Sequence, residues 1–282
     1  MKYYYLLFFH FLFTTIMNAQ SGWTKEKGEY FAKIDISNLS ANKYYSLSGT
    51  ELITSNFNQT SINLYGEYGF KDRFTIITSM PLLRKNSFET SEAVYGIGDL
   101  KIEVKYRLMK NFPLTISIAP EIPTGRSNAF ASNKLNPQDK INLPTGDGEF
   151  NVWSTLAASG SVGKIYSSVY ASYNIRTKYM GLDFRDLYQV GFEFGVNPIN
   201  NLWVNTKVKA QYSTGESKHV DLGFVRGDAS TYTLLSLETF YKISKKIGIS
   251  ATFLSGSEFL APFKNIYIAP YFSFGVIYEN KK

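Results

Sequence analysis

The sequence has no cysteine and only two histidines, His10 and His219, among its 282 residues. Without cysteine there can be no disulfide, no thiol nucleophile and no cysteine metal site. His10 lies in a leader that is predicted below to be removed, and His219 lies in a predicted outer loop. Because a hydrolase of the Ser/His type needs a histidine held on rigid structure, the sequence predicts no enzyme, no catalytic residue, no metal site and no cofactor.

Long hydrophobic runs are also absent after residue 20, where no stretch reaches the about 18 apolar residues that a membrane-spanning helix needs. The leader carries one positive charge at Lys2, a mostly apolar run from Tyr3 to Phe13, and a small residue, Ala19, at the expected cleavage point. This is the layout of a secretory signal peptide, and the run is too short for a membrane anchor. The sequence therefore predicts a cleaved signal peptide at 1–19 and one domain at 20–282.

Acidic residues are fewer than basic ones, 23 against 30, which gives a formal net charge of +7. A basic balance suits nucleic-acid binding, but no basic run, zinc-ligand pattern or helix-turn-helix signal accompanies it. Solvated loops and anionic lipid headgroups account for the charge more simply. Nucleic acid is therefore not a predicted partner.

What the sequence does contain is alternation. From Leu100 to Leu108 apolar residues occupy every even position and charged residues every odd one, a period of two that is typical of a β-strand. Similar segments recur along the chain, and each is long enough for the about 9–11 residues that a tilted strand needs to cross hydrocarbon. The twelve predicted strands are 28–39, 53–70, 73–84, 95–108, 112–123, 149–162, 164–178, 185–198, 202–214, 228–243, 247–256 and 263–279.

The connections between these strands alternate in length. Short turns are predicted near 71–72, 110–111, 163–164, 198–201 and 244–246, and longer polar loops near 40–52, 85–94, 124–148, 179–184, 215–227 and 257–262. With 16% aromatic residues, this pattern predicts an all-β fold, a transmembrane antiparallel up-and-down β-barrel of about 12 strands of the bacterial outer-membrane type. A soluble β-sandwich would have shorter strands and no such alternation.

The predicted location is the outer membrane of a Gram-negative bacterium, with outer-membrane lipids as partners. The last strand, which ends on aromatic residues from Phe272 to Tyr278, resembles the C-terminal signal of bacterial barrel proteins. That resemblance implies the barrel-assembly machinery as a further partner. Four residues at segment ends are predicted to be anchors at the lipid interface: Tyr30, Tyr106, Trp203 and Tyr278.

If the apolar face of each strand meets lipid, the opposite face lines the lumen. Charges of both signs occur there in roughly equal number. They either pair across the lumen and plug it or line a path for small solutes. The lumen-lining candidates are Lys33, Asp35, Glu67, Asp99, Lys101, Glu103, Lys105, Arg107, Glu121, Arg176, Glu193, Lys207, Lys209 and Glu238.

Three short motifs resemble a known family: 96–101 (Gly-Ile-Gly-Asp-Leu-Lys), 105–108 (Lys-Tyr-Arg-Leu) and 120–125 (Pro-Glu-Ile-Pro-Thr-Gly). The family is the transporter-like outer-membrane proteins named after the meta-pathway of phenol degradation. The resemblance covers about 95–125, and a second Pro-Thr-Gly stands at 144–146. It implies a barrel associated with the uptake of small, often hydrophobic or aromatic compounds. By their residue types alone, these glycines and prolines suit strand ends and turns.

The predicted function is a passive channel or transporter for small solutes, hydrophobic or aromatic ones among them. The alternative is a non-conducting structural or surface-binding outer-membrane protein that uses the 124–148 loop as its contact surface. That loop is predicted either to fold over the barrel mouth or to be a free surface loop. In the first case Arg126, Lys134 and Lys140 would meet lumen carboxylates such as Glu121, and the apolar attachment residues would be Phe130, Leu135, Ile141 and Leu143.

Overall fold

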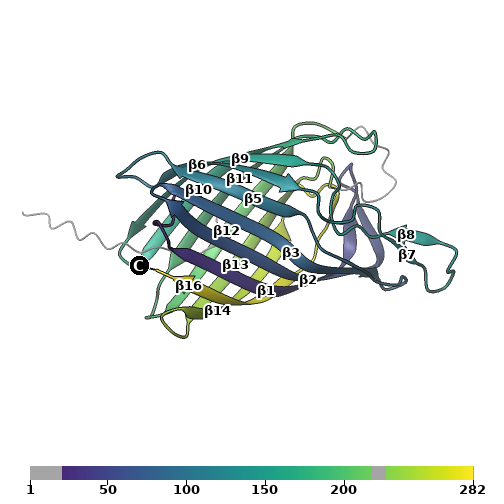
Figure 1. Ribbon diagram of the computed structural model, residues 1–282. Coiled ribbons are helices and arrows are strands. Elements are labelled where there is room, and N and C mark those ends of the chain that lie inside the picture. Colours follow the sequence, from purple (N-terminus) through teal and green to yellow (C-terminus); the bar gives the residue numbers. More distant parts are fainter. Residues whose placement is uncertain (1–20, 218–226, 282) are drawn as a thin grey trace, which may run out of the picture.

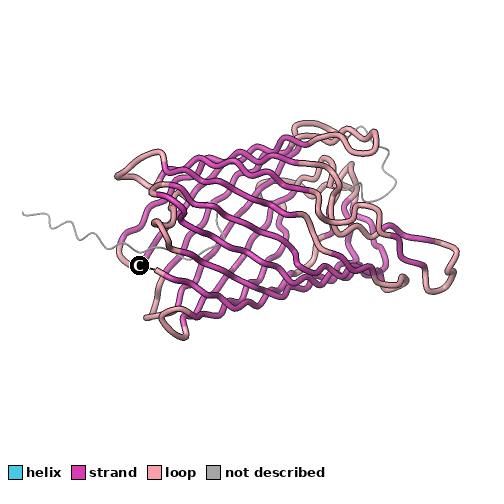
Figure 2. The backbone as a smooth tube through the Cα atoms, in the orientation of Figure 1, coloured by secondary structure: helices cyan, strands magenta, loops and turns pink. Residues whose placement is uncertain are grey.

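The computed structural model describes residues 21–217 and 227–281. The predicted signal peptide and His219 lie outside these ranges. Twelve long antiparallel strands form one closed barrel, with the strands tilted against its long axis (Figures 1 and 2). The barrel strands are β1 (Tyr30–Tyr45), β2 (Glu51–Lys71), β3 (Phe74–Phe88), β5 (Leu100–Arg107), β6 (Leu114–Ile122), β9 (Asn151–Val162), β10 (Ile165–Arg176), β11 (Leu187–Val196), β12 (Leu202–Ser213), β13 (Tyr232–Lys242), β14 (Ile247–Ser257) and β16 (Tyr271–Asn280).

Each of these strands pairs with its neighbours along the chain, and β1 closes the sheet by pairing with both β2 and β16. The predicted fold class, an all-β up-and-down barrel of twelve strands, is therefore confirmed. One end, which we call the short-turn end, holds the β2–β3, β5–β6, β9–β10, β11–β12 and β13–β14 turns, the start of β1 and the end of β16. We call the opposite end the long-loop end. Within the described ranges, no helix is long and apolar enough to cross a membrane.

Two predicted strands are interrupted. The segment predicted as 95–108 is divided into β4 (Val94–Gly96) and β5, and the segment predicted as 263–279 is divided into β15 (Ile266–Tyr267) and β16. The second break includes Pro270, which has no N–H to donate to a ladder. Gly96 ends β4 and Gly98 lies within the first break, where its N–H donates to the Pro81 carbonyl of β3 at 2.8 Å.

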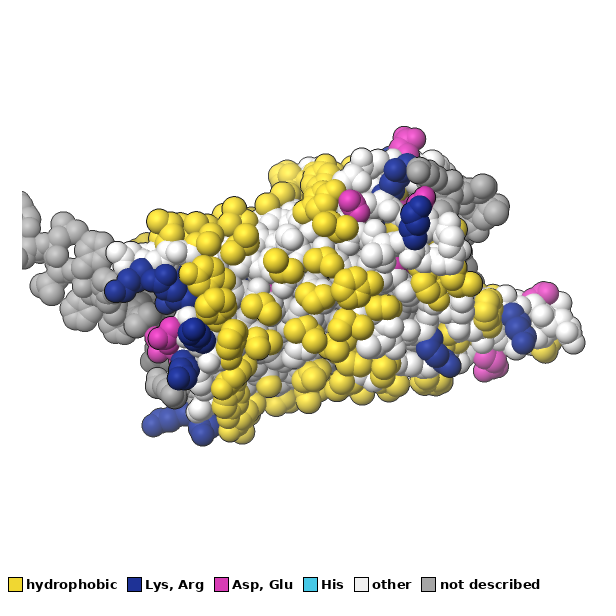
Figure 3. All heavy atoms as spheres, turned by 45° about the horizontal axis from the view of Figure 1, so that its top comes forward, with side chains coloured by type: hydrophobic (Ala, Val, Ile, Leu, Met, Phe, Trp, Pro, Cys, Tyr) yellow, Lys and Arg dark blue, Asp and Glu magenta, His cyan; other side chains and the backbone are white. Residues whose placement is uncertain are grey.

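The alternation of side chains separates the two faces of the wall. In β1 the side chains of Lys33, Asp35 and Ser37 are buried inside, whereas Ile34 and Ile36 are 51% and 53% exposed on the outside. The other strands repeat this pattern, so the outer wall is apolar while charged side chains gather toward the two ends (Figure 3). This is the inverse of a water-soluble sheet and the arrangement expected of a wall that faces hydrocarbon.

The predicted loop at 124–148 contains a hairpin, β7 (Phe130–Ser132) and β8 (Lys140–Asn142), which projects beyond the long-loop end (Figure 1). Its base packs on β4 and on the long-loop ends of β2 and β3 through a buried cluster of Val94, Ala129, Ala131 and Leu143, with Phe57 and Phe88 alongside. The prediction that Phe130 and Leu135 attach the loop is wrong, because they are 60% and 87% exposed. The small side chains of Ala129 and Ala131 fit into the buried cluster, whereas the larger side chains of Phe130 and Leu135 point to the outside.

The other contacts predicted for this loop are also wrong. Arg126 Nη2 donates to the Tyr95 carbonyl at 2.8 Å, and Lys134 Nζ donates to the Glu89 carbonyl at 2.9 Å. Both side chains therefore bind backbone oxygens outside the lumen, because the hairpin leads away from the opening. Lys140 is exposed on it.

The two faces make a direct test possible on adjacent residues of β13. Leu237, 44% exposed, faces outward, and Ser236 lines the lumen. We expect Leu237→Arg to lower the free energy of unfolding in lipid by about 2–4 kcal/mol, because it places a charge in hydrocarbon. Ser236→Arg places the same charge in a wet lumen and should cost much less. Urea titration of the two variants in vesicles measures the difference, and equal losses would contradict the assigned faces.

Candidate functional site

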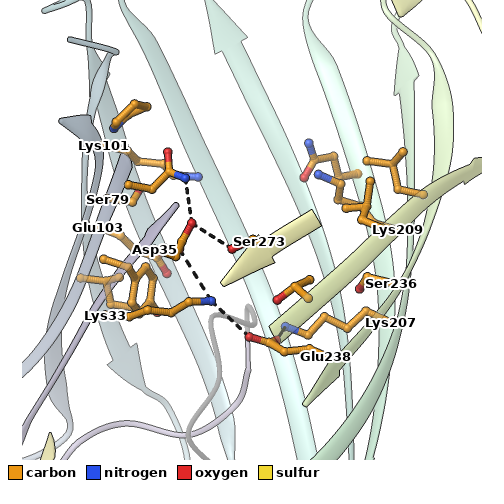
Figure 4. Close-up of a pocket in the computed structure, with 18 of the residues that line it drawn as sticks. Lys33, Asp35, Ser79, Lys101, Glu103, Lys207, Lys209, Ser236, Glu238 and Ser273 are labelled. Atoms are coloured by element: carbon orange, nitrogen blue, oxygen red, sulfur yellow. Dashed lines mark hydrogen bonds and ion pairs between the residues drawn. The ribbon is translucent and has the colours of Figure 1, made fainter. Parts of the chain in front are cut away.

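The barrel encloses a cavity of about 690 Å³. Its walls come from strands on opposite sides of the barrel (Figure 4). Eleven of the fourteen lumen candidates line it: Lys33, Asp35, Asp99, Lys101, Glu103, Lys105, Glu121, Glu193, Lys207, Lys209 and Glu238. Charges of both signs therefore line the cavity, together with apolar side chains such as Leu64, Ile77 and Leu254.

An ion-pair network occupies one side of this cavity. Glu238 of β13 accepts from Lys33 of β1 at 3.3 Å and from Lys207 of β12 at 2.9 Å. Lys33 also lies 3.7 Å from Asp35, and Lys207 lies 3.9 Å from Glu193. Lys33 thus reaches past β16 and β14, which separate its strand from β13 (Figure 4). Opposite charges brought together in this way offset the cost of burying each one alone.

Nearer the long-loop end, Lys101 and Lys209 extend from opposite walls (Figure 4). Lys101 Nζ lies 5.0 Å from the ring centre of Trp153, and Lys209 Nζ lies 5.5 Å from that of Tyr232. Glu121, the register partner of Lys101, accepts the Trp153 indole N–H at 3.0 Å. This level of the cavity therefore combines two cations with aromatic rings and one fixed carboxylate.

Asp99 joins the two Pro-Thr-Gly segments. Its Oδ1 accepts the N–H of Gly125 at 2.9 Å, and its Oδ2 accepts the N–H of Asp147 at 2.7 Å. The Thr124 hydroxyl donates to the Gly98 carbonyl at 2.7 Å. Although Asp99 lines the cavity, its carboxylate is engaged by the loops, so its role is to hold them.

Two side chains of β3 complete this unit. Arg84 Nη1 donates to the Thr145 carbonyl at 2.8 Å, and Asn86 Nδ2 donates to the Pro144 carbonyl at 2.6 Å. The motif residues at 96–101, 120–125 and 144–146 thus form one architectural element at the rim of the barrel. The two Pro-Thr-Gly segments share one structural role, because the Asp99 carboxylate binds the backbone at the end of each.

Three candidates lie outside the cavity. Arg176 forms a buried ion pair with Glu149 toward the long-loop end, with the ring of Phe184 stacked on its guanidinium at 4.7 Å. Glu67 lies 3.5 Å from Lys25. Arg107 lines a second cavity, of about 420 Å³, at the short-turn end. The alternation of side chains along each strand assigned all three residues to the lumen face. It carries no information about how deep a residue lies along the barrel axis.

Asp147 reaches the cavity from a loop and could not be found by strand alternation. Burial, together with the neighbouring carboxylates of Glu149 and Glu121, raises the pKa of Asp147 to about 7. Its charge therefore changes around neutral pH.

Trp203 is not the interfacial anchor that the sequence predicted. It packs inside the barrel at the short-turn end against a buried cluster of Phe31, Phe240 and Ile277, with Tyr65 alongside. The terminal position of a tryptophan in its strand does not tell which face it occupies. This aromatic cluster fills one side of the lumen at that end.

No family model and no curated protein matches the sequence, so membership of the phenol-pathway family stays a prediction. Among solved structures, an outer-membrane channel from Pseudomonas putida F1 is similar, with a TM-score of 0.69 at 13% identity over 94% of this chain and 100% of that one. The translocator domain of the autotransporter NalP from Neisseria meningitidis gives a TM-score of 0.53 at 9% identity over 89% of this chain and 88% of that one. At such identities these likenesses show the fold alone.

The Asp99 unit can be tested by substitution. We expect Asp99→Ala to lower the free energy of unfolding by about 1–3 kcal/mol, because two partly buried N–H groups lose a charged acceptor. Limited proteolysis should then cut the 124–148 region faster. The matched control is Asp183→Ala, which removes an exposed ion pair with Lys178 at 2.8 Å and should cost less than about 1 kcal/mol. Equal proteolysis of the Asp99 variant and the native protein would contradict the holding role.

Proposed function

We propose that this protein is an outer-membrane channel through which small solutes diffuse. The observation that carries the proposal is a charged cavity of about 690 Å³ enclosed by a barrel whose outer wall is apolar. A cavity lined by charges holds water, and water inside a wall that faces lipid makes a path for solutes. The shared fold with an outer-membrane channel supports the same reading.

The membrane location is part of the proposal. Outward side chains such as Phe272, Phe274 and Val276 of β16 are between 49% and 63% exposed, which would be costly in water over a whole wall. Lipids of a bacterial outer membrane would cover them, and the barrel-assembly machinery would insert the chain.

For the solute class, the size and chemistry of the lumen favour compounds that carry a polar or charged group. The cavity is within the about 300–1,000 Å³ typical of small-molecule sites. Fixed charges would interact only weakly with a purely apolar solute. The rings of Trp153, Tyr170 and Tyr232 would contact an aromatic solute. Small aromatic compounds with a polar group suit both features and agree with the family resemblance.

A non-conducting role remains the second candidate because two features favour it. The aromatic cluster around Phe31, Phe240 and Trp203 fills part of the short-turn end. The β7–β8 hairpin projects outward with Phe130 and Leu135 exposed, as a surface-binding protein would need. Solute flux separates the two functions.

Flux should be measured by the swelling of proteoliposomes in glucose, lysine and benzenesulfonate, which cross lipid slowly by themselves because they are strongly polar or permanently charged. We expect faster swelling than in empty liposomes, with a trisaccharide excluded by the lumen. Ser236→Trp should slow the flux several-fold because the ring enters the cavity. Leu237→Trp, which adds the same ring on the outer face, should not. Swelling no faster than in empty liposomes for every solute would leave the non-conducting role.

A further inference from the structure

Residues 21–27, which we call the inner segment, precede β1 and lie inside the barrel at its short-turn end. The main chain of the inner segment bonds to inward-facing hydroxyls of three strands. The pairs are the Ser21 carbonyl with the Thr115 hydroxyl of β6 at 3.1 Å, the Gly22 N–H with Ser159 Oγ of β9 at 2.7 Å, and the Lys25 N–H with Thr75 Oγ1 of β3 at 2.8 Å. Thr75 and Thr115 are the register partners of Lys105 and Arg107 on β5. The inner segment therefore lies across four neighbouring strands, β3, β5, β6 and β9.

Glycines allow the inner segment to approach the wall closely at both of its ends. A Cβ added to Gly22 would lie 1.9 Å from the Pro113 carbonyl oxygen. A Cβ added to Gly69 of β2 would lie 2.0 Å from the Glu26 carbonyl oxygen. Because neither position has room for a side chain, the wall forms a close-fitting seat for the segment.

Large side chains fill the cross-section beside the inner segment. The ring of Trp23 meets that of Tyr166 on β10 edge to face, with the ring centres 5.7 Å apart. The Tyr166 ring lies over Gly195 of β11, where an added Cβ would be 1.9 Å from it, and the Tyr166 hydroxyl donates to Asn205 of β12. Tyr166 thereby covers β10, β11 and β12.

The aromatic cluster covers the remaining strands. It consists of Phe31 of β1, Tyr65 of β2, Trp203 of β12, Phe240 of β13 and Ile277 of β16. The Phe240 ring also lies over Gly248 of β14, where an added Cβ would be 2.3 Å from it. Lys25 joins the cluster to the inner segment, because its Nζ lies 5.4 Å from the ring centre of Phe31 and 3.5 Å from Glu67 of β2. One continuous layer thus touches every strand of the barrel.

This layer separates the two cavities. The main cavity of about 690 Å³ lies on its long-loop side, and the second cavity of about 420 Å³ lies on the side of the β2–β3 turn, against Asp72 and Arg73. Of the residues that the structure describes, none lines both cavities. Inward side chains within the layer are almost wholly buried, with Thr75 and Thr115 each 1% exposed and Tyr166 4%. The lumen is therefore closed at the short-turn end in this conformation.

The inner segment is the part of the layer that can move while the sheet stays intact. None of its residues belongs to a strand, whereas the cluster residues and Tyr166 do. Its main-chain bonds to the wall end on hydroxyls, and water can replace those bonds when the segment leaves. Gly28, with a φ of 82°, turns the chain between the segment and β1, so the segment is attached to the barrel at one end by a turn.

The wall beneath the inner segment is lined mostly by small side chains. Those of β3, β6 and β9 are Thr75, Thr115, Ala157 and Ser159. The longer side chains of Lys105 and Arg107 on β5 flank them. Departure of the segment would therefore leave an opening on this side of the lumen, opposite the aromatic cluster.

We propose that the inner segment is a gate. When seated it closes the short-turn end of the proposed channel, and the channel conducts while the segment is out of its seat. The inference rests on the proposed channel and names the part that opens it, so the flux predicted above passes during the fraction of time that the gate is open. Lids of this kind open on the order of microseconds to seconds without global unfolding.

The gate is tested by exchanging the charges of Lys25 and Glu67 and recording single channels in planar bilayers. Lys25→Glu should raise the fraction of time that a channel is open several-fold, because it turns an attraction into a repulsion. Lys25→Glu with Glu67→Lys restores the attraction and should return the open fraction most of the way to the native value. Lys27→Glu, the matched control, makes the same change of charge at an exposed residue of the inner segment and should leave the open fraction unchanged. Equal open fractions in the native protein and in Lys25→Glu would overturn the gate.

Deletion of 21–27 gives a second test and should leave the channels open nearly all the time. Gly22→Ala should raise the open fraction in the same direction, because its Cβ does not fit the seat, whereas Gly160→Ala, whose added Cβ meets nothing within 4 Å, should not. A deletion protein that keeps its β-type circular dichroism and opens no more often than the native protein refutes the gate and leaves the channel standing. Absence of conductance from both the native and the deletion protein refutes the channel itself.

Discussion

Hydrogen bonds between β1 and β16 close the sheet, and the inverted character of its two faces depends on this closure. A sheet placed in hydrocarbon cannot leave N–H and C=O groups unpaired at an edge. Ten residue pairs, from Tyr30 with Asn280 to Leu39 with Tyr271, join the first and last barrel strands. With both sides of β1 paired, the outer face can be apolar without creating a site of aggregation, and the inner face is free to hold polar groups.

Closure also determines what the interior charges do. Lys33, in the first strand of the chain, and Glu238, in β13, are far apart in the sequence. They meet only because the sheet closes on itself, with β16 and β14 between their strands. Some inward charges form such pairs, and others, such as Lys105 and Arg107, have none among the described residues. The paired charges offset each other's cost of burial, whereas the unpaired ones are the charges that would act on a solute in the proposed channel. The same row of inward positions thus holds both kinds of charge, at different depths.

The architecture could be predicted from the sequence, because a period of two assigns each side chain to a face and the lengths of the connections assign the ends. The depth of a residue along the barrel could not be predicted, so no sequence signal indicated that Arg107 and Arg176 lie outside the main cavity. Trp203 was predicted as an anchor from its place at a strand end, whereas its side chain lies inside the barrel. The contacts of loop residues could not be predicted from the sequence either. The contacts of Asp99 depend on two turns about 20 residues apart in the chain, and those of residues 21–25 depend on single hydroxyls from three strands. Neither set of contacts leaves a periodic signal in the sequence.

The central claim is that the inner face of the wall is wet and the outer face is covered by lipid. Because the chain has no cysteine, single cysteines along β13 can report on each face with a charged thiol reagent that does not enter lipid. In proteoliposomes, cysteines at Leu234 and Ser236, which line the cavity, should react. Cysteines at Leu235 and Leu237 should react only after the protein is unfolded. Reaction at all four positions, or at the outward pair alone, would contradict the account.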